Sequence, residues 1–471
     1  MIKYQLIERI TRAVNEALAH GRLQADTLPP ITVEHPQNAE HGDYATSLPL
    51  KMAGPASARP MDIAGDIADL ISPGPEIDSV HVAPPGFINF TLNRIWLARQ
   101  IDSILKAGHS YGNIPLGNGK RVQIEFVSVN PTGPLHVGHG RGAILGSVLA
   151  STLAAAGYYV EKEYYINDAG AQTRAFAHSL YVRYQQEMGL SSGMPDDGYH
   201  GIYMIDLARE IIAREGDRFL EIAEKDAVSA LGRIGLDMML EHIRNDLEEL
   251  GVTFDVWFSE QSLYDGGQYE TAKSILEKSG YITEKEGATW YVSTAFGEDK
   301  DNVIRRADGY PTYFAADIAY HYNKLIERSF DIVIDIWGSD HQGHVSRMKA
   351  VLGALGIDPD RLRVIISQLV TLRRGRDLVR VSKRSGDIIT LREVIDEVGS
   401  DACRFFFLAR SADSQMDFDL ELAKKQSEDN PVYYVQYAHA RIASIIQLSR
   451  ERDIDFSDGD VALLTEPAEI N

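Results

Sequence analysis

Residues 125–139 read EFVSVNPTGPLHVGH, and this stretch decides how the rest of the chain is organised. Residues 121–127, at its start, are rich in apolar and β-branched side chains, which predicts a buried strand. From about Gly140 to Ala156, small and aliphatic residues continue without a proline, which predicts a helix that ends at Gly157. A strand, a turn and a helix start in this order place backbone N–H groups and the positive end of the helix dipole where they can bind a phosphate.

Two histidines close this stretch. His136 and His139 are three residues apart, so both lie on one face of the first helical turn and can donate hydrogen bonds to charge on one phosphate. Gly138 between them leaves room for a flat base to lie against the backbone. These features predict a site for a nucleotide whose phosphate is attacked. Histidines also cap helix ends, so a capping role for the pair is the alternative.

A dinucleotide-binding fingerprint is a second alternative. Gly138, Gly140 and Ala143 match its spacing. Glu161 or Glu163, about twenty residues further on, could then contact a ribose. The fingerprint requires its first glycine directly after the strand, whereas a proline-containing loop of about ten residues intervenes here. The sequence therefore disfavours a dehydrogenase.

Length and composition restrict the class of protein. A chain of 471 residues is too long for one hydrophobic core, so roughly two to four domains are expected. With 68 acidic and 47 basic residues the net charge is −21, which argues against indiscriminate nucleic-acid binding but permits a local basic face. The single cysteine, Cys403, excludes a disulfide framework and a multi-cysteine zinc site, and no apolar run is long enough to span a membrane. A cytoplasmic enzyme is expected.

The order of the expected elements predicts an α/β fold. Apolar residues recur at helical spacing in residues 2–20, and strands are expected at 158–166, 331–337 and 363–370, with helical segments between them. Five parts are expected along the chain: an N-terminal α+β domain at 1–112, a catalytic domain with a parallel sheet at 113–399, an insertion in it at about 174–300 that is mostly helical up to residue 260, a helical stem at 400–429, and the incomplete beginning of a helical bundle at 430–471.

Polar residues follow two of the expected strands. Residues 167–172 read NDAGAQ and residues 338–341 read GSDH, and the carboxyl ends of parallel strands are where α/β sheets contact ligands. A helix cap explains residues 167–172 equally well. Tyr313 and Asp317 are four residues apart in an expected helix, so they share one face.

One part of this acidic chain is strongly basic. Residues 380–386 read RVSKRSG, and five arginines precede them between residues 361 and 376. A mobile loop that carries Lys383 can close over a triphosphate and stabilise charge on a leaving pyrophosphate. Taken alone, the stretch fits an ordinary solvated basic loop better.

Three of these signals resemble the motifs of class I aminoacyl-tRNA synthetases. HVGH at 136–139 resembles the HIGH motif, VSKRS at 381–385 resembles the KMSKS loop, and GSDH at 338–341 stands where the ribose-contacting motif of that fold falls. The similarity to bacterial arginyl-tRNA synthetases extends over nearly the whole chain. It is most specific in three segments: residues 125–139, 163–172 and 430–441.

The resemblance implies a Rossmann-like catalytic domain and a reaction in two steps. L-Arginine is activated by ATP to arginyl-adenylate, and the arginyl group is then transferred to the 3′ end of tRNA(Arg), with release of pyrophosphate and AMP. Mg²⁺ is expected on the ATP phosphates, and no residue is predicted to bind a metal ion directly. The N-terminal domain is expected to contact the elbow of the tRNA, bound tRNA is expected to be needed for the first step, and the enzyme is expected to be a monomer.

The resemblance also implies roles for single residues. The catalytic residues would be His136, His139 and Lys383. The ATP-binding residues would be Gly138, Gly338, Asp340, His341, Val381 and Ser382. The arginine-binding residues would be Glu125, Ser128, Asn130, Tyr313 and Asp317.

The chemistry of arginine agrees with the last group. The guanidinium is planar, permanently charged and carries five N–H donors, so its pocket needs carboxylate and oxygen acceptors in fixed positions. Tyr313 and Asp317 match the positions for the guanidinium, while Ser128 and Asn130 would lie near the α-amino and carboxylate groups, an end supported by Glu125. An uncharged amino acid would leave Asp317, expected to be buried, without a partner, so no editing domain is required.

Two departures from the family pattern stand out. Val381 occupies the place of the usual methionine in the lysine loop, and Arg380 that of its first lysine. The C-terminal helical domain, which reads the anticodon in the family, is only begun, so we expect it to be truncated.

Other functions explain less of the sequence. A glutamyl-type synthetase needs a cation where Asp317 stands, and a cysteinyl enzyme needs zinc-binding cysteines. An H-x-G-H nucleotidyltransferase explains the histidines but neither the loop of Lys383 nor the flanking helical domains. A non-catalytic tRNA-binding module would not need the histidines at all.

Overall fold

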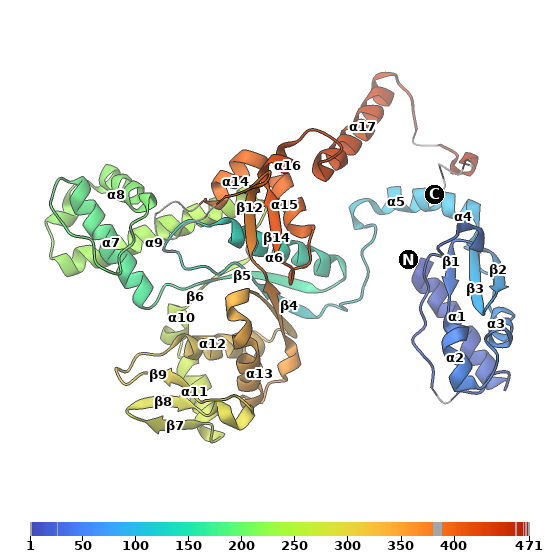
Figure 1. Ribbon diagram of the computed structural model, residues 1–471, viewed down its shortest axis with the longest axis horizontal. Coiled ribbons are helices and arrows are strands. Elements are labelled where there is room, and N and C mark those ends of the chain that lie inside the picture. Colours follow the sequence, from blue (N-terminus) through green and yellow to red (C-terminus); the bar gives the residue numbers. More distant parts are fainter. Residues whose placement is uncertain are drawn as a thin grey trace. The chain divides into compact units, whose positions relative to one another are not determined.

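The computed structural model describes residues 2–25, 27–379, 389–456, 459–464, 466 and 469 (Figure 1). The chain divides into two compact units. Unit 1 comprises Met1–Asn113 and Gln447–Asn471, and unit 2 comprises Ile114–Ile446. Within the described ranges, none of the helices combines the length and the apolar character that a membrane span requires.

Unit 1 contains a small antiparallel sheet and a layer of helices. The strands pair in the order β1-β3-β2. Their bounds are β1 (Tyr44–Thr46), β2 (Ile77–Ala83) and β3 (Phe87–Leu92). The helices are α1 (Ile2–Ala19), α2 (Leu48–Ala56), α3 (Pro60–Ala68), α4 (Arg94–Ala98) and α5 (Gln100–Ala107). Leu6, Ile10 and Val14 recur along α1 and are fully buried against Ile63 and Ile67 of α3 in one cluster, which confirms the amphipathic helix expected at residues 2–20.

Unit 2 is built on a parallel sheet of five strands in the order β11-β10-β4-β5-β6. All neighbouring strands in it run parallel. The strands are β4 (Arg121–Glu125), β5 (Tyr159–Ile166), β6 (Val256–Ser259), β10 (Ile332–Gly338) and β11 (Leu362–Ser367). The chain order reverses between β4 and β10, and at such a switch point a crevice opens beyond the carboxyl ends of the strands.

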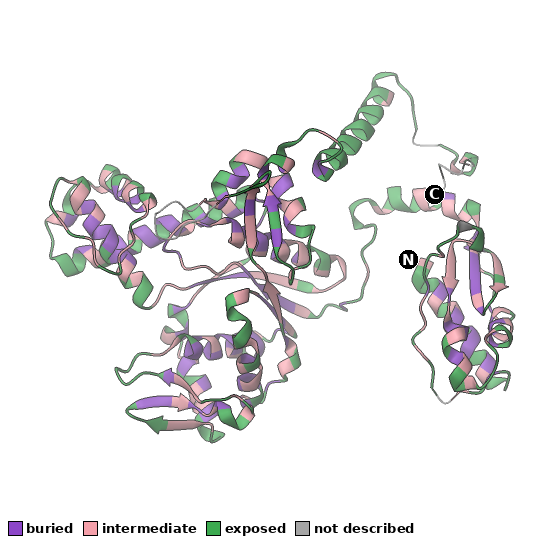
Figure 2. Cartoon of the chain, viewed as in Figure 1, coloured by how far each residue is buried: buried purple, intermediate pink, exposed green. Residues whose placement is uncertain are grey.

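Helices cover both faces of this sheet (Figure 1). One face carries α6 (Val137–Ala155), α14 (Leu391–Val398) and α15 (Ser400–Leu408), and the other carries α12 (Tyr313–Tyr322) and α13 (Val345–Ala354). Neighbouring side chains of β10 point to opposite faces, so Val333 packs under α12 and α13 while Ile334 packs under α6. β4 and β10, which lie between these helix layers, are largely buried (Figure 2).

Close packing fixes α6 on the sheet. A Cβ atom built on Gly146 would lie 2.2 Å from Cγ of Phe126, which directly follows β4. Only glycine permits this approach of helix and strand. The helix that carries the histidine pair is thereby held against the strand that precedes it.

The remaining elements connect and flank the central sheet. Between β5 and β6, α7 (Ala171–Glu187), α8 (Ile202–Glu215) and α9 (Glu224–Glu249) share a core of their own. Between β6 and α12 lie α10 (Gln261–Asp265), α11 (Gln268–Lys278) and an antiparallel sheet of β7 (Ile282–Lys285), β8 (Ala288–Tyr291) and β9 (Asn302–Arg305). After β11 follow β12 (Val370–Arg374), β13 (Asp377–Leu378), β14 (Met416–Asp419), α16 (Leu420–Lys424) and α17 (Pro431–Glu451).

The α/β fold and its parallel sheet confirm the prediction, as does the strand, turn and helix around residues 125–139. Two expected elements were wrong. Residues 256–259, expected to be helical, form the edge strand β6, which is too short for the period of its side chains to be recognised. The strand expected at 363–370 ends at Ser367, because Val370 begins β12 in a different sheet. The division of the chain into five parts stays a prediction.

Candidate functional site

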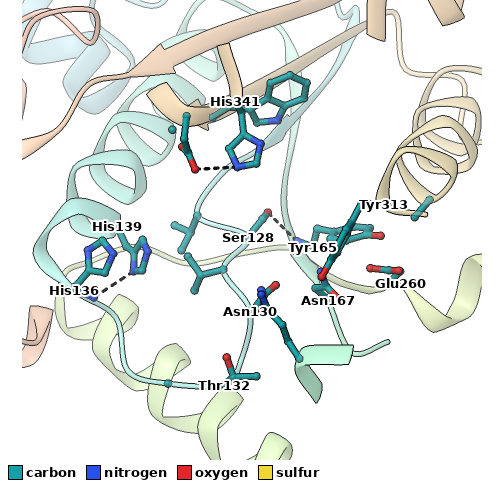
Figure 3. Close-up of a pocket in the computed structure, with 18 of the residues that line it drawn as sticks. Ser128, Asn130, Thr132, His136, His139, Tyr165, Asn167, Glu260, Tyr313 and His341 are labelled. Atoms are coloured by element: carbon teal, nitrogen blue, oxygen red, sulfur yellow. Dashed lines mark hydrogen bonds and ion pairs between the residues drawn. The ribbon is translucent and has the colours of Figure 1, made fainter. Parts of the chain in front are cut away.

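A cleft of about 2120 Å³ opens at the switch point of the sheet, beyond the carboxyl ends of β4, β5 and β10 (Figure 3). Ten of the residues to which the resemblance assigns a role line it: Glu125, Ser128, Asn130, His136, His139, Tyr313, Asp317, Gly338, Asp340 and His341. Gly138 lies between two of them but is itself not among the described residues that line the cleft. Val381, Ser382 and Lys383 lie outside the described residues.

The two histidines stack at the start of α6. Their ring centroids are 3.5 Å apart, and the rings are inclined by 27°. His136 is the N-cap residue, and its Nδ1 accepts from the backbone N–H of Gly138 at 3.1 Å. Nδ1 of His139 accepts from the backbone N–H of His136 at 3.2 Å. Because Nδ1 is an acceptor in both neutral rings, the proton of each lies on Nε2, which is the donor. The capping role and the phosphate-binding role are therefore compatible.

The loop between β4 and α6 has an unusual backbone. Val127 and Ser128 have φ angles of 70° and 42°, a left-handed conformation that is strained for side chains other than glycine. The end of β5 holds it in place: the hydroxyl of Tyr164 donates to the carbonyl of Val129 at 2.8 Å, and the N–H of Tyr165 donates to Oγ of Ser128 at 3.1 Å. Strain that is retained beside a cleft is typical of a functional loop.

Glu260 is an acid in this cleft that the sequence analysis missed. It directly follows β6, and only 5% of the residue is exposed. The hydroxyl of Tyr264 donates to its Oε1 at 3.3 Å, and the amide of Asn167, oriented so that its N–H groups face acceptors, donates to Oε2 at 3.2 Å. Burial, and after it the negative charges of Asp317 and Asp168, raise the pKa of Glu260 to about 7, although the hydroxyls of Tyr165 and Tyr264 oppose the shift. A cation bound nearby would favour the ionised form of Glu260 and lower this pKa.

Asp317 and Tyr313 lie on the same face of α12 and both line the cleft, as the spacing predicted. The expectation that Asp317 is buried was wrong, and the carboxylate already has a partner before any amino acid binds. Its side chain is 34% exposed, and its Oδ2 is 2.9 Å from Nε2 of His344. The carboxylate is partly exposed because it lines the cleft and does not pack into the core.

The segment after β10 forms the opposite wall. Gly338 ends the strand, and η6 (Ser339–His344) follows it. Nε2 of His341 is 3.5 Å from Oδ2 of Asp340, and both side chains are exposed. The ring of Trp337 packs against His341 and His344, with centroid distances of 6.4 and 5.6 Å. This wall offers a carboxylate and ring nitrogens to a polar ligand beside an aromatic surface.

The polar residues after β5 have mainly structural partners. Oδ2 of Asp168 accepts from Oγ of Ser259 at 2.5 Å, and Oδ1 accepts from the N–H of Gln261 at 3.1 Å. Asp168 therefore ties the end of β5 to the end of β6, next to Glu260. Gln172 accepts a hydrogen bond from the amide of Asn130 and so connects α7 to the loop after β4.

Glu125 lies at the floor of the cleft, at the end of β4. Its Oε2 accepts from Nζ of the buried Lys324 at 2.5 Å. Burial raises the pKa of Glu125, while Lys324 opposes that shift. This acid thus already has one cationic partner inside the protein.

The comparisons with known proteins agree on one family. A family model described as "tRNA synthetases class I (R), catalytic domain" matches residues 100–419, and a model described as "Arginyl tRNA synthetase N terminal domain" matches residues 5–92. A protein of Dehalococcoides mccartyi named arginine–tRNA ligase is 59% identical over 469 residues, which cover 100% of this chain and 84% of that protein. One of the same name from Carboxydothermus hydrogenoformans is 48% identical over 474 residues, with 99% and 85% covered.

A solved structure shares the fold. The arginyl-tRNA synthetase of Thermus thermophilus superimposes with a TM-score of 0.75 at 22% identity, covering 100% of this chain and 85% of that chain. At this identity the likeness concerns the fold alone. It agrees with the class I architecture of the central sheet.

Proposed function

The chain belongs to the class I arginyl-tRNA synthetase family, and we propose that its cleft activates arginine with ATP by means of the residues that line it. The activity is that of a ligase, which joins arginine to tRNA at the expense of ATP. The observation that supports the residue assignments is that one cleft holds both the histidine pair and two neighbouring carboxylates, Asp317 and Glu260.

Asp317 and Glu260 are proposed to bind the guanidinium. Each lines the cleft, and the charge of Asp317 raises the pKa of Glu260, so the two carboxylates lie close enough to repel. A guanidinium between them would remove this repulsion and supply N–H donors to both acids. Tyr313, one helical turn from Asp317, would close the pocket on its solvent side. A glutamate side chain would meet the same two acids and be repelled, which disfavours a glutamyl-type enzyme.

The opposite end of arginine is proposed to lie over the loop after β4. Ser128 and Asn130 line the cleft there, and Glu125 lies at its floor. In this orientation the carboxylate of arginine points toward the start of α6. It would reach the α-phosphorus of an ATP whose ribose contacts Gly338, Asp340 and His341.

The chemistry then requires little more than positioning and charge stabilisation. A carboxylate oxygen of arginine forms a bond to the α-phosphorus, and the bond from that phosphorus to the bridging oxygen breaks, so pyrophosphate leaves with the electron pair. The Nε2–H groups of His136 and His139 would donate to the oxygens that gain charge, and Lys383 would stabilise the leaving pyrophosphate. The terminal ribose hydroxyl of the tRNA then attacks the arginyl carbonyl carbon, and AMP leaves.

Mg²⁺ is proposed to enter with ATP. Among the residues that the structure describes there is no cluster of three or more histidine, cysteine or acidic side chains that could hold a metal ion. On general chemical grounds, the ion would be held mainly by phosphate oxygens, as is usual for Mg²⁺ in nucleotide sites, and would neutralise charge on the leaving group. Three further points stay predictions: that the N-terminal domain contacts the elbow of the tRNA, that the enzyme is a monomer, and that it is cytoplasmic.

Pyrophosphate exchange tests this assignment. The exchange of labelled pyrophosphate into ATP is measured with each of the twenty amino acids in turn, with tRNA present. Arginine alone is expected to support it, His136→Ala is expected to lose most of the rate, and Asp317→Ala is expected to lose the preference for arginine. If Asp317→Ala uses arginine as well as the unaltered protein does, the proposed pocket is wrong.

A further inference from the structure

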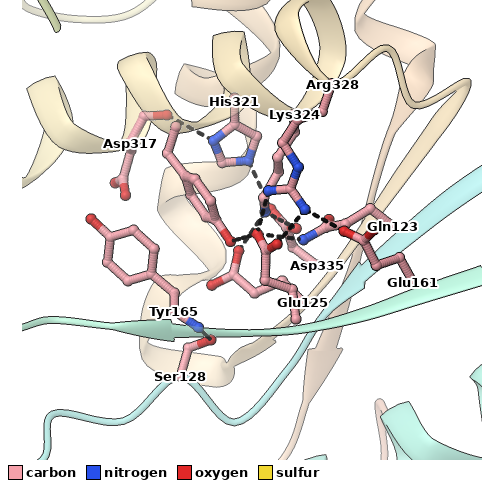
Figure 4. Close-up of polar contacts among 12 residues, drawn as sticks. Gln123, Glu125, Ser128, Glu161, Tyr165, Asp317, His321, Lys324, Arg328 and Asp335 are labelled. Carbon is pink, nitrogen blue, oxygen red and sulfur yellow. Dashed lines mark hydrogen bonds and ion pairs between the residues drawn. The ribbon is translucent and has the colours of Figure 1, made fainter. Parts of the chain in front are cut away.

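Four side chains of opposite and alternating charge form a chain beneath the cleft (Figure 4). Nζ of Lys324 donates to Oε2 of Glu125 at 2.5 Å and to Oδ1 of Asp335 at 3.0 Å. Oδ2 of Asp335 lies 2.7 Å from Nε2 of His321. Glu125 is 8% exposed, His321 2%, and Lys324 and Asp335 not at all.

His321 connects these charged side chains to the backbone of Asp317, which is proposed to bind the guanidinium. Its Nδ1 lies 2.8 Å from the carbonyl oxygen of Asp317. A carbonyl and a carboxylate are both acceptors, so both ring nitrogens of His321 must donate and the ring is an imidazolium. Burial opposes this charge, but the charge and hydrogen bond of Asp335 outweigh it and raise the pKa of His321. When Glu125 and Asp335 are ionised, their two negative charges balance the positive charges of Lys324 and His321.

Strand register and helical spacing bring these residues together. Glu125 and Asp335 are direct partners in the parallel register of β4 and β10. Asp317, His321 and Lys324 follow at intervals of four and three residues and so share one face of the helical segment above the sheet. Lys324 lies in η5 (Asn323–Glu327), a π-helical turn that continues α12, and such turns are frequent at functional sites.

Stability does not explain why this chain of charges is buried. Ion pairs taken out of water give up so much hydration that apolar residues of similar size often stabilise a fold equally well. Hydrogen bonds between the charged groups fix a geometry that apolar contacts would not fix. Each of these bonds forms only at one distance between the strand and the helical segment. Here the spacing joins the end of β4, the middle of β10, and the last turn of α12 with the π-helical turn that follows it.

We infer that Lys324 is a positioning residue that sets the distance between the two ends of the arginine pocket. The inference rests on the proposed function, in which Glu125 supports the α-amino end and Asp317 binds the guanidinium. Through Asp335 and His321, Lys324 connects the backbone segments that carry both acids. A pocket of fixed length accepts arginine and rejects guanidino amino acids that are one methylene shorter or longer, an alteration that binding alone discriminates by about tenfold or more.

The test is a change in length preference. Pyrophosphate exchange, with tRNA present, is measured for L-arginine, for L-homoarginine and for 2-amino-4-guanidinobutanoate, which is one methylene shorter. In Lys324→Met we expect the ratio of kcat/KM for arginine to that for homoarginine to fall about tenfold. We expect most of the fall to come from a higher KM for arginine, because the variant changes the pocket and not the phosphate site.

Arg328→Met is the matched control. Arg328 follows Lys324 on the same helical face, and its guanidinium is paired with Glu163 at 3.0 Å and with Glu161. It is not among the described residues that line the cleft. Its loss is expected to lower the melting temperature and to leave the length preference unchanged. If Lys324→Met also lowers only the melting temperature, or if Arg328→Met changes the preference equally, the inference is overturned.

Two further measurements keep the test decisive. If Lys324→Met does not fold, His321→Gln replaces it, because glutamine can still donate to Asp335 but no longer supplies the second donor to the carbonyl of Asp317. The same fall in preference is expected, and an unchanged preference overturns the inference. Asp317→Ala separates the two proposals. If this variant still uses arginine as before, the proposed pocket is contradicted. If it loses arginine use while Lys324→Met keeps its length preference, only the positioning role of Lys324 is contradicted.

Discussion

Arginine binding should depend on pH through Glu260, because the pKa of this acid lies near 7 when no cation is bound. A guanidinium beside the carboxylate favours the ionised form, so arginine binds to the ionised acid and expels the proton from the protonated one. The apparent association constant for arginine is then the intrinsic constant multiplied by the fraction of the protein in which Glu260 is ionised. Affinity is expected to rise with pH up to about 7 and to level off above it.

The size of the effect follows from that pKa. At pH 6, about one unit below it, roughly a tenth of the molecules carry an ionised Glu260, so the dissociation constant for arginine should be about tenfold higher than on the alkaline plateau. At pH 7 the factor should be about two. Burial is the main cause of the raised pKa, and the neighbouring charges of Asp317 and Asp168 add to it.

The assay is equilibrium binding of labelled arginine between pH 6 and pH 8.5 at constant ionic strength. Glu260→Gln is the control: it retains His341, His344 and Asp317 but removes the titrating group. We expect this variant to bind arginine more weakly throughout and to lose the tenfold change between pH 6 and pH 8. A flat profile in the unaltered protein, or the same slope in Glu260→Gln, would refute this role of Glu260.

Three other substitutions test separate parts of the account. Asp317→Ala should raise the KM for arginine by about one to two orders of magnitude, roughly what losing a hydrogen bond to a charged group costs, and leave the KM for ATP nearly unchanged in the exchange assay. His136→Ala and His139→Ala should each lower kcat for exchange by about 10²–10³ while the KM for arginine changes little, because each removes a donor that acts on the phosphate in the transition state. Gly146→Ala should destabilise unit 2 by about 1–3 kcal/mol in thermal unfolding, because the new methyl group overlaps the ring of Phe126; an unchanged melting temperature would contradict the close packing of α6.

The parts of the fold that could be predicted are those with long or strongly punctuated patterns. The strand before residues 125–139 and the helix after it are marked by β-branched residues, by Pro131 and Pro134 and by Gly157, which has a φ of 83° at the end of α6. β6 escaped prediction because it has only four residues between helical segments. Its place in the sheet depends on pairing with β5, a long-range contact that no local pattern reveals.

The candidate site divides in the same way. Residues in recognisable motifs, such as His136, His139 and Asp317, were found from the sequence and line one cleft. Glu260 was missed because it follows the strand that was missed; a polar residue at the end of an unrecognised strand gives no signal of its own. Lys324 and His321 were missed because charges at helical spacing usually lie on a solvated face, and only the tertiary structure shows this face packed on the sheet.

The central claim is that one cleft holds the phosphate end of the reaction at the histidine pair and the guanidinium at two carboxylates. The most direct measurement is a crystal structure of the protein with a non-hydrolysable sulfamoyl analogue of arginyl-adenylate. We predict that the guanidinium lies within hydrogen-bonding distance of Asp317 and Glu260, and the sulfamoyl oxygens within that distance of His136 or His139. A guanidinium bound to other acids, or a sulfamoyl group remote from both histidines, would contradict the claim.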